Sequence, residues 1–84
     1  MRPYAVYINE AALISAPRSG WQRAAVMSFV RSLADNPHAS GDFSEKDASG
    51  RVVQVKVVGR HAVTFWADHA VSEVKVTHIQ TADA

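Results

Sequence analysis

The spacing of apolar and polar residues changes along the chain, and each change marks an expected element. Residues 4–8 are rich in β-branched and aromatic side chains, which predicts a first strand. Asn9 is the expected N-cap of a short helix that begins at Glu10 and ends before Pro17. Apolar residues then recur at helical spacing over residues 21–34, which predicts a second helix.

The second half of the chain has the two-residue period of strands. Residues 38–50 are polar, so we expect a loop there. Three strands are then predicted, over residues 53–57, 61–66 and 72–79. The predicted order is β-α-α-β-β-β, an α+β fold in which an antiparallel sheet has two helices packed on one face. The whole chain, residues 1–84, is expected to form a single domain.

The hairpin between the first two of these later strands can close in two registers. A two-residue loop, 59–60, places Lys56 on the same face as Phe65, whereas a three-residue loop, 58–60, gathers Phe65 with the valines and leans His61 toward Val57. A change of one residue exchanges the two faces, so the coherent apolar set favours the three-residue loop. The helices should then cover the valines. The opposite face, where we expect the functional surface, would carry Gln54, Lys56, Ala62, Thr64, Trp66, Glu73, Lys75 and Thr77.

Composition narrows the class of protein. With 84 residues, of which 48% are hydrophobic and 20% charged, a disordered or fibrous chain is excluded. The absence of cysteine excludes disulfides and thiolate zinc sites. No apolar run reaches the roughly 18 residues of a membrane span, and residues 1–4 do not resemble the start of a signal peptide. We therefore expect a cytoplasmic protein that does not interact with membranes.

Charge is distributed unevenly, although the net charge is only +1. Residues 1–34 carry four arginines and one glutamate, a net charge of +3, whereas residues 35–50 carry a net charge of −3. A protein that coats duplex DNA usually has a much larger basic excess. The charge pattern therefore argues against non-specific coating of nucleic acid and still allows a local basic site that touches a few phosphates.

Several segments together resemble the RelE/ParE toxin superfamily of bacterial toxin–antitoxin systems. They are residues 33–37, 41–47, 50–60, 61–69 and 73–76, which cover much of the chain, and the predicted order of elements agrees with the family. The resemblance implies a toxin or toxin-derived component that a small antitoxin protein neutralises. RelE-like members cut messenger RNA on the ribosome, whereas ParE-like members act on DNA gyrase.

The resemblance also implies a set of site residues. RelE-like ribonucleases carry two lysines at alternate positions of one strand, where this chain has Gln54 and Lys56. They carry an arginine where this chain has Ala62, with Arg60 and His61 close by. The resemblance thus implies an mRNA interferase that needs no metal and no other cofactor, with Lys56, Arg60 and His61 as its catalytic residues.

Two alternatives to this enzyme stay open, because residues 78–84 lack the arginine and tyrosine of the family's basic tail. One is a non-catalytic binding module with the RelE fold, and the other is a gyrase-directed toxin. Gln54, Trp66 and Lys75 are the candidate RNA- or partner-binding residues, since an indole can stack on a base or anchor a partner helix.

The histidines give no metal motif. His38, His69 and His78 are separated by irregular spacings and fall on different elements, and none forms a helical pair four residues apart. We therefore expect no metal site in this protein.

Overall fold

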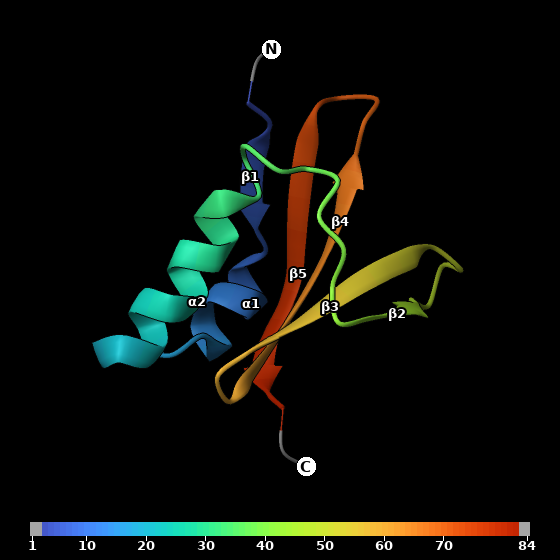
Figure 1. The fold of residues 1–84 in the computed structure, drawn as a ribbon. Helices are drawn as coiled ribbons and strands as arrows, with labels where there is room; N and C mark the ends of the chain where they lie inside the picture. Colours follow the sequence, from blue (N-terminus) through green and yellow to red (C-terminus); the bar gives the residue numbers. More distant parts are fainter. Residues whose placement is uncertain (1–2, 83–84) are drawn as a thin grey trace.

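The computed structural model describes residues 3–82, which form a five-stranded sheet with two helices on one of its faces (Figure 1). The α+β class predicted from the sequence is confirmed. In chain order the elements are β1 (Ala5–Ile8), α1 (Glu10–Ser15), α2 (Gly20–Ser32), β2 (Phe43–Lys46), β3 (Val52–Val58), β4 (His61–Asp68) and β5 (Glu73–Thr81). Across the sheet the strands lie in the order β1-β5-β4-β3-β2.

Two features of the sheet differ from the prediction. β2 lies within the expected loop, where all four of its residues are exposed and pair antiparallel with β3. So short a polar strand has no buried face and therefore no apolar alternation to reveal it. β1 pairs with β5 in parallel, so the sheet is mixed and the expectation of an antiparallel sheet is wrong. The helices and the other strands lie between β1 and β5 in the sequence and provide the long connection that parallel neighbours require.

The helices begin and end where the sequence predicts, within one or two residues. The side-chain oxygen of Asn9 accepts a hydrogen bond from the backbone N–H of Ala11 at 2.8 Å, which caps α1. Pro17 lies between α1 and α2, and α2 begins at Gly20, which has φ +77°. The Ser15 hydroxyl donates to the Ile79 carbonyl at 2.6 Å, so the end of α1 is fixed on β5.

The main core lies between the helices and the sheet. Phe29 of α2 meets Phe65 of β4 edge-on, with ring centroids 5.6 Å apart. An irregularity in the pairing of β5 with β4 leaves Thr77 as an extra residue, so Val76 and Ile79, three positions apart, both face the helices. The buried residues of this core are Ala12, Ala16, Val26, Val30, Leu33, Val63, Phe65, Val74, Val76 and Ile79.

The turn between β3 and β4 is the two-residue turn, so the prediction of a three-residue loop is wrong. Gly59 adopts φ +60°, and Gln54 pairs with Phe65 across the two strands. Gln54 and Lys56 therefore lie on the face that carries the helices and not on the opposite face. His61 pairs with Val58 and does not lean toward Val57.

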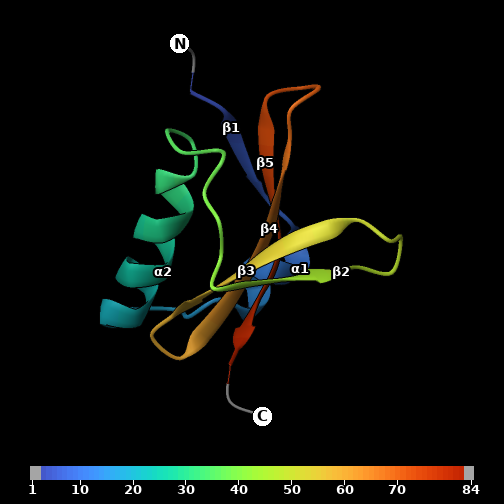
Figure 2. The same cartoon turned by 45° about the vertical axis from the view of Figure 1, so that its right-hand side comes forward.

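The physical reason for this error is that both faces of β3 are buried in part. Val53 and Val55 are each only 3% exposed, although they face away from the helices. The hairpin of β2 and β3 crosses β4 and β5 at a steep angle (Figure 2), and Val53 lies with Thr64 and Thr77 in the depression on that side. In β3 the alternating valines therefore identify a buried face, but that face is not the one that the helices cover.

The connection from α2 to β2 passes close to β3 at Gly41. A Cβ atom on Gly41 would overlap the carbonyl group of Val55. The backbone N–H of Asp42 donates to that same carbonyl at 2.8 Å, and the Asp42 carboxylate accepts from the N–H of Val57 at 2.7 Å. Only glycine allows this approach.

Within residues 3–82, no helix is long and apolar enough to cross a membrane.

Replacing Gly41 by alanine should destabilise the fold, because the obstructing atoms belong to the backbone of β3 and cannot rotate away. We expect Gly41→Ala to lower the free energy of unfolding by roughly 1–3 kcal/mol. The exposed Ser44→Ala in β2 should change it by less than about 0.5 kcal/mol. Urea denaturation of both variants measures the difference, and equal effects would contradict the close approach.

Candidate functional site

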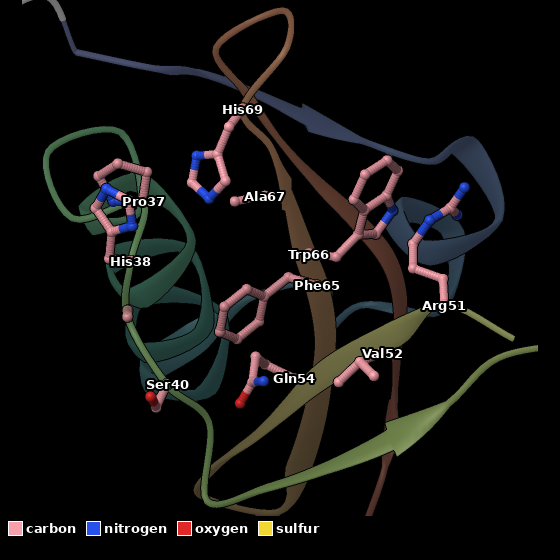
Figure 3. Close-up of a pocket in the computed structure, with 11 residues that line it drawn as sticks. Pro37, His38, Ser40, Arg51, Val52, Gln54, Phe65, Trp66, Ala67 and His69 are labelled. Carbon is pink, nitrogen blue, oxygen red and sulfur yellow. The ribbon is translucent and has the colours of Figure 1, made fainter.

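A groove opens between the α2–β2 connection and the sheet (Figure 3). It is open to solvent and has a volume of about 370 Å³. Its lining combines a guanidinium, two imidazoles, an indole, an amide and a hydroxyl above an apolar floor, and no carboxylate is found among the described residues that line it. These residues are Pro37, His38, Ala39, Ser40, Arg51, Val52, Gln54, Phe65, Trp66, Ala67 and His69.

One wall of the groove is built around Trp66. The guanidinium carbon of Arg51 lies 3.9 Å from the centroid of the indole, and Lys75 Nζ lies 5.1 Å from it. Lys75 is opposite Trp66 in the β4–β5 register, on the face away from the helices, as the sequence predicts. Lys75 also pairs with Asp68 at 3.3 Å and with Glu73 at 3.9 Å. The stack holds Arg51 beside Trp66 at the edge of the groove, and the charges of both cations are shared with carboxylates, since Arg51 also lies 3.4 Å from the Asp47 carboxylate.

The other wall carries two histidines. The rings of His38 and His69 are stacked, with centroids 4.8 Å apart and planes 19° from parallel. The hydroxyl of Tyr4 lies 2.8 Å from Nδ1 of His69, and the Tyr4 ring meets the imidazole edge-on. Tyr4 precedes β1, His38 follows α2, and His69 follows β4, so three separate segments of the chain form this wall. In Figure 3 the His69 ring is directed toward His38 and the groove.

The base of the groove is apolar, with one amide beside it. Phe65 and Ala67 of β4 and Val52 of β3 provide the apolar atoms. Gln54 Oε1 accepts from the backbone N–H of Gly41 at 3.0 Å, which leaves the side-chain NH₂ group able to donate to a ligand. The arrangement suits an anionic group near Arg51 and flat rings along the walls.

The structure divides the predicted site residues among different environments. Gln54 and Trp66 line the groove, and Lys75 contacts Trp66 from the next strand. Lys56 faces the helix side of the sheet, where its Nζ lies 3.3 Å from the Asp42 carboxylate.

The other two predicted catalytic residues lie at the β3–β4 turn. Arg60 is exposed in the turn itself. His61 opens β4, and its Nδ1 is buried without a hydrogen-bond partner in the described part of the chain. Lys56 is thus occupied by a carboxylate and His61 is partly enclosed, so the predicted catalytic set does not share the groove.

The sequence interpretation missed Arg51, His38, His69 and Tyr4. Arg51 lies just before β3, so the alternation of apolar and polar residues within that strand says nothing about where its side chain lies. The two histidines are far apart in the sequence, and only the folding of three connections together brings them into contact. No group of three or more histidines and carboxylates able to hold a metal occurs among residues 3–82.

Known proteins do not assign a role to the groove. A scan of family models and searches of curated proteins and of solved structures found no match to this chain. The resemblance to the RelE/ParE superfamily consequently stays a hypothesis, and the function must be argued from the residues of the site.

Two carboxylates of the acidic segment, those of Asp42 and Asp47, accept hydrogen bonds within the fold. The backbone N–H of Val57, and then the Lys56 ammonium, lower the pKa of Asp42 below its ordinary value. The Ser49 hydroxyl, with backbone N–H groups and Arg51, lowers the pKa of Asp47. Both carboxylates are therefore stabilised in their ionised form by this part of the fold.

The lowered pKa of Asp42 predicts a dependence of stability on pH. Because the folded-state pKa lies below the ordinary value of 3.8, the ionised carboxylate stabilises the fold above pH 3.8, and this contribution is lost as the pH falls through the folded-state pKa. We expect Asp42→Asn to be less stable than the wild type at neutral pH, with the difference shrinking at acidic pH. Urea denaturation at a series of pH values tests this, and a difference independent of pH would contradict it.

Proposed function

We propose that this chain is a toxin-like component of the RelE/ParE type that binds single-stranded RNA in the groove and is neutralised by a small antitoxin protein. The observation that carries the proposal is the lining of the groove, which offers a guanidinium stacked on an indole, two imidazoles and a phenyl ring, with no carboxylate among the described residues that line it. Messenger RNA on the ribosome is the proposed target, which implies a cytoplasmic location.

The side chains of the groove match the chemistry of an unpaired RNA strand. Single-stranded RNA is recognised by stacking of its bases on aromatic rings and guanidinium planes, and by hydrogen bonds to the base edges. Arg51 can meet a phosphate, the rings of Trp66 and His38 can border a base, and the free NH₂ of Gln54 can donate to a base edge. An open groove suits an extended strand better than an enclosed small molecule.

A non-catalytic binding module is the second candidate. The contact between Lys56 and Asp42 favours it, because an ammonium already paired with a carboxylate is less able to stabilise charge on a cleaving phosphate. In this candidate the fold and the partner are retained, while the chemistry implied for Lys56, Arg60 and His61 is absent. DNA gyrase is the third candidate target, and the cellular experiment below distinguishes it.

The surface proposed for the antitoxin lies on the helices. Ile14 of α1 and Trp21 of α2 are 67% and 68% exposed, and Leu13, next to Ile14 in the sequence, is exposed as well. Exposed large apolar side chains are the kind of contact that protein interfaces bury. Binding of a partner to the folded state would also stabilise a chain with so small a core.

Removing the cation of the groove should weaken RNA binding in a salt-dependent way. For a phosphate contact to single-stranded RNA, we expect Arg51→Ala to reduce the slope of log affinity against log salt concentration by about 0.7. Arg31→Ala, which removes an exposed arginine of α2 outside the groove, should leave the slope unchanged. Fluorescence anisotropy with a labelled RNA measures both. Unchanged affinity and slope in Arg51→Ala would contradict the assignment of the groove.

Expression of the chain in bacteria should arrest growth, with protein synthesis failing before DNA supercoiling changes. Co-expression of an adjacent small reading frame should restore growth, and its product should co-purify with this chain. Incorporation of labelled amino acids and plasmid topology measure the order of events. A change of supercoiling that comes first would favour gyrase, and uninterrupted growth would favour the non-catalytic module.

A further inference from the structure

Arg51, the cation at the edge of the groove, already has an anionic partner within the chain. Its Nη1 lies 3.4 Å from Oδ2 of Asp47, and the two side chains are 44% and 31% exposed. Asp47 does not line the groove but lies in the depression on the sheet face away from the helices. The two side chains therefore meet where the groove ends, and a ligand of Arg51 must approach this contact.

The turn between β2 and β3 fixes the Asp47 carboxylate in place. Its Oδ1 accepts hydrogen bonds from the backbone N–H of Ser49 at 2.9 Å, from the Ser49 hydroxyl at 2.7 Å and from the backbone N–H of Arg51 at 2.9 Å. The Ser49 hydroxyl above all, and with it the backbone N–H groups and Arg51, lowers the pKa of Asp47, so the carboxylate is ionised at neutral pH. Because Oδ1 is held by the turn, Oδ2 stays directed at Arg51.

We infer that Asp47 competes with the ligand for Arg51 and thereby sets the affinity and the specificity of the groove, an inference that rests on the proposed RNA binding. The contact at 3.4 Å is longer than the roughly 2.7–2.9 Å of a strong charge-assisted hydrogen bond. An exposed ion pair of this kind is weak, so a phosphate can displace the carboxylate from Arg51. Asp47 lowers the affinity for the phosphate without abolishing it.

An internal competitor favours ligands that make more than one contact. A free carboxylate offers Arg51 the same group that Asp47 already holds beside it at a high effective concentration, so an acidic peptide gains little by replacing it. An RNA strand also places its bases against the aromatic walls of the groove, and Asp47 does not oppose those contacts. Asp47 therefore excludes simple anions more strongly than it excludes RNA.

The variant Asp47→Asn separates the charge of this residue from its part in the turn. An asparagine oxygen can accept the same three hydrogen bonds, so the thermal midpoint should change little. We expect the affinity for a labelled single-stranded RNA, measured by fluorescence anisotropy, to rise by about three- to tenfold, because the competing ion pair and the repulsion between carboxylate and phosphate are both removed. Glu45→Gln removes the charge of an exposed glutamate of β2 outside the groove and should raise the affinity by less than about twofold.

Three further measurements show whether the effect passes through Arg51. Asp47→Asn should bring no gain in the Arg51→Ala background, because the phosphate then has no cation for which Asp47 competes. Poly-glutamate should displace RNA from Asp47→Asn at a lower concentration than from the wild type. In the wild type, the NMR signal of the Asp47 carboxyl carbon should shift when RNA is added, while that of Glu45 stays in place.

The results distinguish this inference from the proposed function. Binding that is lost in Arg51→Ala but unchanged in Asp47→Asn, or an equal gain with and without Arg51, would overturn the inference and leave the proposed function standing. Equal displacement by poly-glutamate would do the same. An Asp47 signal that does not respond to bound RNA would also overturn the inference, even if Asp47→Asn folded poorly. Absence of RNA binding by the wild type would overturn both.

Discussion

The two-residue turn at residues 59–60 fixes the register of β3 against β4, and most of the groove depends on that register. With Gln54 opposite Phe65, the polar side chains of β3 face the helix side, where the α2–β2 connection lies. On that side the Gln54 side chain accepts a hydrogen bond from the Gly41 N–H, and Lys56 forms an ion pair with Asp42. A shift of one residue would place valines beside this connection and remove both partners. The turn therefore decides where the groove can form.

The elements that local pattern determines could be predicted from the sequence. The Asn9 cap, the helix break at Pro17 and the helical spacing of α2 are properties of short segments, and each is found in the structure. The position of Trp66 and Lys75 on one sheet face could also be predicted, because alternation within β4 and β5 requires it.

The features that could not be predicted depend on contacts between distant segments. The apolar pattern of β3 predicts the wrong register because Val53 and Val55 are buried on the face that the helices do not cover. The parallel pairing of β1 with β5 depends on the path of the whole chain. The stacked rings of His38 and His69 belong to two connections that are far apart in the sequence, and no periodic pattern of residues relates the two positions. The predicted site therefore included Gln54 and Trp66 but not the second wall of the groove.

The fold also explains how a chain with a net charge of +1 can present a site for a polyanion. Charges beyond about 8–10 Å are screened at physiological ionic strength, so a ligand responds to the groove and not to the net charge. The Asp42 carboxylate is engaged by Val57 and Lys56. The Asp47 carboxylate lies 3.4 Å from Arg51, the cation that a phosphate would contact. A bound phosphate must therefore compete with Asp47 for Arg51, because one guanidinium cannot give its full charge to both. This competition favours contacts with few phosphates and a shallow dependence on salt, as expected for a local site on a nearly neutral protein.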